Sequence, residues 1–134
     1  MGGGLILETT FLVDLKRELA RHTPGPAQGF LDTRDQPLYL TFTVVGEVAA
    51  GTEASARRRW ELLIAPFEIL PCTADVCWEY GQAFQFLKRN GLLIGANDLW
   101  IAATALAFGK PVVTRNLREF QRVPGLTVLD YTTA

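Results

Sequence analysis

Short, strand-prone apolar runs alternate along this chain with longer segments of helical periodicity. The runs are three or four residues long and lie at 5–7, 38–40, 67–70, 112–114 and 127–129. Between them, apolar side chains recur every three or four residues, as on one face of a helix. This alternation predicts an α/β fold, with a mainly parallel central sheet and helices on both of its faces. Ligands of such folds collect at the carboxyl ends of the strands.

Residues with strong preferences for helix ends mark the expected boundaries. Thr9 or Thr10 can cap the first helix, and Thr43 opens the helix after the second strand. Further helices are expected at about 52–65, 73–90, 97–108 and 117–120, with a weaker one around residue 30. Gly91 and Gly109 stand where left-handed residues end helices.

The length of 134 residues favours a single domain spanning 1–134. With 49% hydrophobic and 20% charged residues, the composition is that of an ordinary globular protein. The apolar stretches are interrupted well before the roughly 18 residues that a membrane span requires, so we expect a cytoplasmic protein with no membrane partner. Cys72 and Cys77 are too few for a zinc site or a disulfide framework, and we expect both to be buried thiols.

The charge balance limits how nucleic acid could bind. A net charge of -1 and a pI near 5.8 argue against a broad basic face, so any contact with phosphates must be local. Three basic clusters are candidates for such a contact. They are Arg57–Arg59, Lys88–Arg89, and Arg115 with Arg118 and Arg122. For the first two, a solvated helix face is the better interpretation.

Acidic residues follow several of the predicted strands. Glu8 ends an apolar run, and Glu47 is the only charged residue between positions 38 and 52. Asp98 begins a helix, and Glu119 with Asn116 follows the fourth strand. Considered singly, Asp98 could be a first-turn acid that interacts favourably with the helix dipole, and Glu119 could be an ordinary surface charge. Carboxylates that share one rim repel each other unless a divalent cation such as Mg²⁺ or Mn²⁺ binds between them.

Other hydrolytic mechanisms lack the residues they need. The single histidine, His22, lies in a polar turn, which makes histidine-based triads improbable. No glycine-rich loop follows the first strand, so neither a dinucleotide fingerprint nor a P-loop is present. Metal-assisted hydrolysis of a phosphodiester remains.

Four segments of the sequence carry a family resemblance. They read LETTFLVD at 7–14, TVVGEV at 43–48, IGANDLWIAATA at 94–105 and VTRNLREF at 113–120. In this order they resemble the PIN-domain family, and within it the VapC toxins of bacterial and archaeal toxin-antitoxin pairs. The last two segments are the specific ones. The resemblance implies a three-layer PIN-like fold.

The resemblance also implies a site and a reaction. Glu8, Glu47, Asp98 and Glu119 would be the acidic catalytic and metal-binding residues, and Asn116 a neutral ligand or substrate-positioning group. Thr9 and Thr114 look like supporting hydroxyls, and Arg115 like a contact to the scissile phosphate. An aspartate usually stands in the family where this chain has Glu8. The implied activity is that of a Mg²⁺-dependent endoribonuclease leaving a 5′-phosphate.

The implied partners are RNA, a cognate VapB-like antitoxin that crosses the active-site groove, and a second copy in a homodimer. Phe11, Trp60 and Trp78 could supply apolar contact surfaces, although core positions fit them better. Alternatives of the same fold are a housekeeping PIN nuclease in RNA processing and a non-catalytic protein-binding module. A phosphatase is disfavoured, because Thr10 stands where an acid-x-acid arrangement would need its second acid.

Overall fold

Five parallel strands form the centre of the molecule. The computed structural model describes residues 3–133 and places the strands in one sheet of order β3-β2-β1-β4-β5. The strands are β1 (Leu5–Leu7), β2 (Leu38–Thr41), β3 (Glu68–Leu70), β4 (Val112–Thr114) and β5 (Val128–Asp130). All four pairings are parallel, and in the centre Leu7 of β1 is in register with Val113 of β4. The predicted parallel sheet is confirmed.

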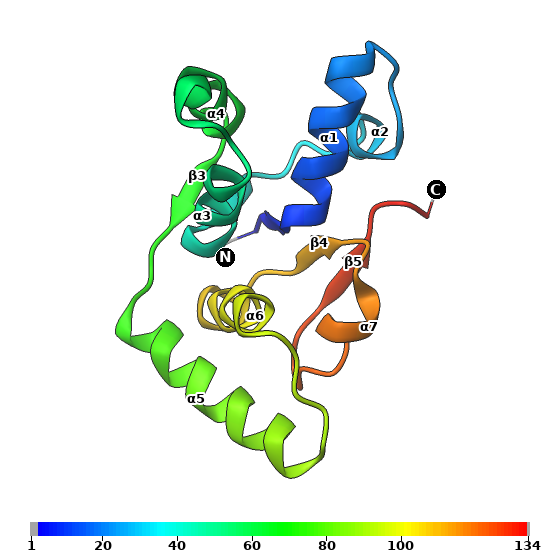
Figure 1. Cartoon of the computed structure of the whole chain (residues 1–134). Helices are drawn as coiled ribbons and strands as arrows, with labels where there is room; N and C mark the ends of the chain where they lie inside the picture. The colour runs from blue at the N-terminus through cyan, green and yellow to red at the C-terminus, as the bar shows by residue number, and fades with distance from the viewer. Residues whose placement is uncertain (1–2, 134) are drawn as a thin grey trace.

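Helices cover both faces of this sheet. They are α1 (Thr9–Arg21), α2 (Pro26–Asp32), α3 (Phe42–Ala50), α4 (Arg57–Ile64), α5 (Ala74–Arg89), α6 (Ala96–Phe108) and α7 (Leu117–Phe120), with a 3-10 turn, η1 (Ala54–Ala56), before α4. Figure 1 shows α1 to α4 on one side of the sheet and α5 to α7 on the other. Right-handed crossover connections require this division, because the chain moves across the sheet one way from β1 to β3 and the other way from β3 through β4 to β5. The three-layer fold is confirmed.

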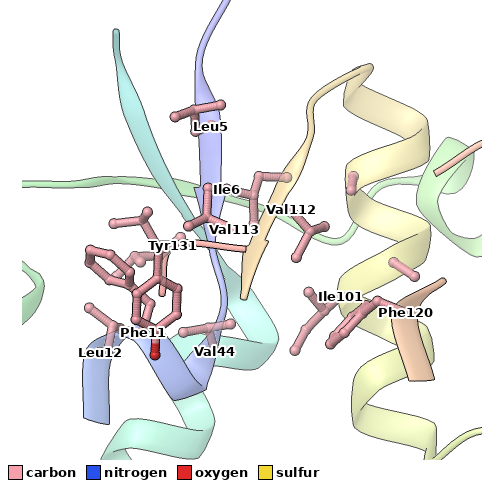
Figure 2. Close-up of a cluster of buried hydrophobic side chains, with 14 of the residues drawn as sticks. Leu5, Ile6, Phe11, Leu12, Val44, Ile101, Val112, Val113, Phe120 and Tyr131 are labelled. Carbon is pink, nitrogen blue, oxygen red and sulfur yellow. The ribbon is translucent and has the colours of Figure 1, made fainter. Parts of the chain in front are cut away.

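The core lies where the central strands meet the helices. β1 and β4 are buried along their whole length, which explains their uninterrupted apolar character. On one side of the sheet, the buried ring of Phe11 meets the rings of Phe30 and Tyr131 edge to face. Figure 2 shows Phe11 and Tyr131. On the other side, Phe120 of α7 packs among the same core residues. None of the helices within residues 3–133 has the length and apolar character of a membrane span.

Two helix starts differ from the sequence prediction. Glu8, not Thr9 or Thr10, is the N-cap residue of α1, and its side chain makes no capping hydrogen bond. The two threonine hydroxyls are directed instead to carboxylates of Glu47 and Glu8. α3 begins at Phe42, and Thr41 caps it by accepting a hydrogen bond from the Val44 amide at 3.1 Å. The predicted helix over 52–65 is divided into η1 and α4.

The ends of the later helices agree with prediction. The C-cap residue of α6 is Gly109, with a φ of 65°, and Gly91 follows the end of α5 with a φ of 66°. Positive φ values favour glycine at both places because a side chain would be strained there.

The expectation that Cys72 and Cys77 are buried is wrong. Both thiols are exposed, and their sulfur atoms lie 3.8 Å apart at the start of α5. Within the described part of the chain, α5 packs mainly against α6 and leaves its opposite face open. Trp78, with 66% of its surface exposed, lies on that open face, whereas Phe11 is buried and Trp60 is half-buried.

Candidate active site

The carboxyl ends of β1 and β4 form the floor of the candidate site. Glu8 directly follows β1, and Thr114 is the last residue of β4. From β1 the chain proceeds toward one edge of the sheet, and from β4 toward the opposite edge. Such a switch point is where open parallel sheets bind ligands. The predicted acids Glu8 and Asp98 therefore belong to a region where the topology favours a site.

Glu8 is held below the surface by two hydroxyl groups. The residue is 4% exposed, and its carboxylate accepts hydrogen bonds from Thr114 Oγ1 at 2.5 Å and Thr10 Oγ1 at 2.7 Å, both to Oε1. A buried carboxylate needs such donors, because an unpaired one carries a large desolvation penalty. Thr114 was expected as a supporting hydroxyl, but Thr10 was not. The one feature of the sequence that could have indicated a role for Thr10 is its position two residues after Glu8, in the first turn of α1.

Glu47 extends the site from α3. Thr9 Oγ1 donates to Glu47 Oε1 at 2.5 Å, and Asn97 Nδ2 donates to Glu47 Oε2 at 3.1 Å. The two bonds tie α3 to the start of α1 and to the first turn of α6. Asn97 was not expected among the site residues, although it directly precedes Asp98 in the sequence.

Asp98 lies in the electrostatic field of the other acids. Burial, and to a smaller extent the charges of Glu8, Glu47 and Glu119, together raise its pKa from 3.8 to about 6. Its one side-chain partner among the described residues is Asn116, whose Nδ2 lies 3.5 Å from Asp98 Oδ2. The structure therefore brings the other three predicted acids within electrostatic reach of Asp98 and places Asn116 beside it.

These acids lack a compensating cation among the side chains. Within residues 3–133, the ion pairs join Arg57 and Arg58 to Glu61, and Arg115 to Asp14. None involves the four acids of the site. Among the described residues, the partners of these acids are neutral hydroxyl and amide donors, so the site suits a hard cation with oxygen ligands.

The side chains do not converge on one point as they stand. Across the described part of the chain, no three acidic, cysteine or histidine side chains are gathered closely enough to hold one ion. The carboxylates of Glu8 and Glu47 are turned toward threonine hydroxyls. The donor chemistry fits Mg²⁺ or Mn²⁺, but the arrangement differs from the single coordination cluster expected from the sequence. Local side-chain rotation would be needed to bring three carboxylates onto one ion.

The basic residues of the third cluster lie at the rim. Arg115 is exposed, and its Nη2 lies 3.6 Å from Asp14 Oδ1. Arg118 is also exposed, whereas Arg122 donates to the main-chain oxygens of Leu92 and Leu93. Arg57 and Arg58 of the first cluster pair with Glu61 on the surface of α4, as expected for a solvated helix face.

Comparison with known proteins gives a consistent family. The PIN domain family matches residues 5–126. Ribonuclease VapC1 of Haemophilus influenzae (strain R2866) is 35% identical over 100 residues, covering 71% of this chain and 75% of the relative. The tRNA(fMet)-specific endonuclease VapC of Salmonella typhimurium (strain LT2) is 38% identical over 71 residues, covering 53% of this chain and 54% of the relative.

A solved structure agrees over nearly the whole length. VapBC-1 from nontypeable Haemophilus influenzae superposes with a TM-score of 0.83 and 28% identity, covering 97% of this chain and 99% of that one. The parallel sheet, the acids at its switch point and these likenesses lead to one assignment. The chain belongs to the PIN domain family, in its VapC branch.

Proposed function

We propose that this protein is a divalent-metal-dependent endoribonuclease of the VapC toxin type, inhibited by a cognate VapB-like antitoxin. The observation that carries the proposal is the group of acids around Asp98, whose raised pKa reflects burial and three neighbouring carboxylates without a paired Lys or Arg. The names of the VapC relatives, which are ribonucleases, support the same reaction class.

The metal would be held by Glu8, Glu47, Asp98 and Glu119, with Asn116 as a neutral ligand. A bound Mg²⁺ or Mn²⁺ supplies an activated water and neutralises charge on the phosphodiester. Thr10 and Thr114 orient Glu8, and Thr9 orients Glu47. These hydroxyls hold the two carboxylates in place, and the side-chain rotation that metal binding needs would rearrange some of these hydrogen bonds.

The substrate in this proposal is RNA, bound through a few local contacts. The acidic pI argues against a large basic face, and the exposed Arg115 and Arg118 lie just beyond the end of β4. The Salmonella relative is named as an endonuclease specific for tRNA(fMet), the initiator tRNA. This tRNA is therefore a suitable first test substrate.

A groove between α1 and α4 suits the antitoxin. It has a volume of about 720 Å³ and is lined by Leu19 of α1 and by Trp60, Leu62 and Leu63 of α4; its charged residues are Lys16, Arg59 and Glu53. Leu19 and Leu62 are 51% and 57% exposed, so apolar surface is open to a partner. An amphipathic segment of the antitoxin with acidic flanking residues would match this lining.

A homodimer is part of the same proposal. Trp78 and Phe84 of α5 are 66% and 37% exposed and offer a candidate surface for the second copy. Sedimentation or light scattering of Trp78→Glu, compared with the unmodified protein, tests this surface: the variant is expected to be monomeric.

The deciding experiment is an RNA cleavage assay with metal control. Purified protein is incubated with initiator tRNA and with total RNA under Mg²⁺, Mn²⁺ or EDTA, and product ends are analysed for 5′-phosphate. Asp98→Asn is expected to abolish cleavage. Asp75→Asn is the matched control, because Asp75 is also a first-turn acid but lies at the exposed start of α5.

Cleavage that persists in EDTA, or in Asp98→Asn, rejects the metal mechanism. Absence of cleavage with every metal, together with intact antitoxin binding, favours the non-catalytic binding module. Cleavage by a protein that has no antitoxin gene beside its own favours a housekeeping nuclease.

A further inference from the structure

A polar network near residue 131 connects the last described strand to the candidate site. Tyr131 follows β5, is 4% exposed, and packs its ring edge to face against Phe11 at a centroid distance of 4.8 Å. Figure 2 shows the two rings together, with the tyrosine oxygen directed toward the start of α1. There the hydroxyl donates to Asp14 Oδ2 at 2.5 Å and lies 3.1 Å from the main-chain oxygen of Thr10. The aromatic packing therefore fixes the hydroxyl on α1.

The same contact fixes the carboxylate of Asp14. Burial and the neighbouring Asp14 charge raise the pKa of Tyr131 well above its ordinary value, so the hydroxyl remains a donor at neutral pH. With Oδ2 engaged by the tyrosine, Asp14 presents Oδ1 to Arg115 Nη2 at 3.6 Å. This distance is longer than that of a strong charge-assisted hydrogen bond, so Asp14 directs the guanidinium without engaging most of its donors.

Arg115 is also anchored through its main chain. Its amide donates to Thr10 Oγ1 at 3.3 Å, and that hydroxyl donates to Glu8 Oε1. Thr10 and Asp14 are four residues apart on α1 and therefore lie on one face of the helix. Arg115 runs along that face, with its backbone beside Glu8 and its guanidinium beside Asp14.

The family resemblance already implies that Arg115 contacts the scissile phosphate of RNA; we propose that Asp14 and Tyr131 are positioning residues that hold its guanidinium in place for that contact. This inference rests on the proposed ribonuclease function and deepens it. Four carboxylates repel an approaching phosphodiester, and a cation held at their rim offsets part of that repulsion. The planar guanidinium suits phosphate because it can donate two parallel hydrogen bonds.

Prior orientation of Arg115 would reduce the entropy lost when RNA binds. Without such a role, the Arg115–Asp14 contact is a partly exposed ion pair of little consequence, because the Arg115 and Asp14 side chains are 45% and 20% exposed. The two interpretations predict different effects on RNA binding, which makes them separable.

The test compares cleavage of initiator tRNA in Mg²⁺ by the unmodified protein and by Arg115→Gln, Asp14→Asn and Tyr131→Phe. We expect Arg115→Gln to raise KM about tenfold and to leave kcat within about twofold. A contact that is equally strong in the bound substrate and in the transition state affects binding alone. Asp14→Asn and Tyr131→Phe should each raise KM about threefold, since they only loosen Arg115. Arg115→Lys should restore part of the loss.

The salt dependence of KM distinguishes a phosphate contact from a purely structural role of Arg115, because a structural role would leave this dependence unchanged. Loss of one phosphate contact lowers the slope of log KM against log salt concentration by about 0.7. The matched control is Arg58→Gln, because Arg58 also pairs with an acid, Glu61, at 3.5 Å on the exposed surface of α4. This control should leave both KM and the slope unchanged.

Fluorescence anisotropy with labelled tRNA, in an Asp98→Asn background, separates the two proposals. If the unmodified protein fails to cleave but Arg115→Gln still weakens binding, the nuclease proposal fails and the phosphate contact stands. The inference is overturned if Arg115→Gln binds RNA as the background protein does, or if Asp14→Asn binds more tightly, which would make Asp14 a competitor of RNA. It is also overturned if Tyr131→Phe lowers Tm but leaves KM and the salt slope unchanged.

Discussion

Thr114 Oγ1 donates a hydrogen bond to Glu8 Oε1 at 2.5 Å, which joins the end of β4 to the residue after β1. Both residues are buried, and 106 positions separate them in the sequence. The same Thr114 hydroxyl accepts a hydrogen bond from the Asn116 amide at 2.9 Å. One side chain therefore sets the orientation of an acid in the site and the path of the chain that leads to Asn116.

Replacement of Thr114 by valine should destabilise the protein and impair cleavage. Valine keeps the shape of the side chain but removes the hydroxyl donor, so the Glu8 carboxylate keeps the Thr10 hydroxyl and loses the one from Thr114. We expect the free energy of unfolding to fall by about 1–3 kcal/mol. Urea denaturation at pH 7 measures this change. Thr114→Ser, which keeps the hydroxyl, should recover most of the stability; an equal loss in both variants would contradict the role given to the hydrogen bond.

The stability of the protein should depend on pH through Asp98. Its pKa in the folded state, about 6, exceeds the ordinary value of 3.8, so the folded state binds the proton more tightly. As pH rises between these values, Asp98 ionises at a cost to the folded state, and stability falls. Because the residue is only half-buried, screening limits the cost to about 1–2 kcal/mol.

Asp98→Asn removes this titration. In the absence of divalent metal, the variant should be more stable than the unmodified protein at pH 7 and no more stable below about pH 4. Thermal unfolding of both proteins across this range, in EDTA, provides the measurement. A stability difference that stays constant with pH would show that the raised pKa is not its origin.

The groove between α1 and α4 should control antitoxin binding independently of catalysis. Leu62→Glu places a charge on its apolar lining and should weaken binding of the cognate VapB-like antitoxin at least tenfold, a change measurable by calorimetry. RNA cleavage should remain unchanged. Leu93→Glu is the control, because Leu93 is 46% exposed and lies outside the groove; equal loss of binding in both variants would argue against the groove.

Both cysteines should react in the folded protein. Cys72 and Cys77 are exposed, so an aqueous thiol reagent is expected to titrate two thiols without denaturant. The variants Cys72→Ser and Cys77→Ser should each titrate one. If the thiols react only after denaturant is added, the result would support the buried cysteines expected from the sequence.

The central features of the fold were predictable because they depend on local patterns. β1 and β4 are buried on both faces, so each appears as an uninterrupted apolar run, and the charge of Glu8 stands out directly after one of them. Gly109 ends α6 as its conformational freedom suggested. These signals lie within a few residues of the feature that they predict.

The remaining features depend on contacts between distant parts of the chain. Thr10 appeared suited to capping, but its hydroxyl is drawn to Glu8 once β1 and β4 are paired. Nothing near Tyr131 in the sequence indicates that it meets Asp14, 117 positions earlier. The cysteines were misjudged because burial is common for that residue type, whereas α5 leaves them on its open side.

The contacts of Thr114 with Glu8 and of Tyr131 with Asp14 also bear on the timing of activity during synthesis. Translation delivers Glu8 and Asp14 early, whereas their partners emerge only after β4 and β5 have been made. A nascent chain that ends before residue 112 keeps the Thr10 donor to Glu8 but lacks Thr114, the site residues Asn116 and Glu119, and the Tyr131 ring that fixes Asp14. The proposed nuclease would therefore remain inert on the ribosome, beside abundant RNA, until the final strands have docked.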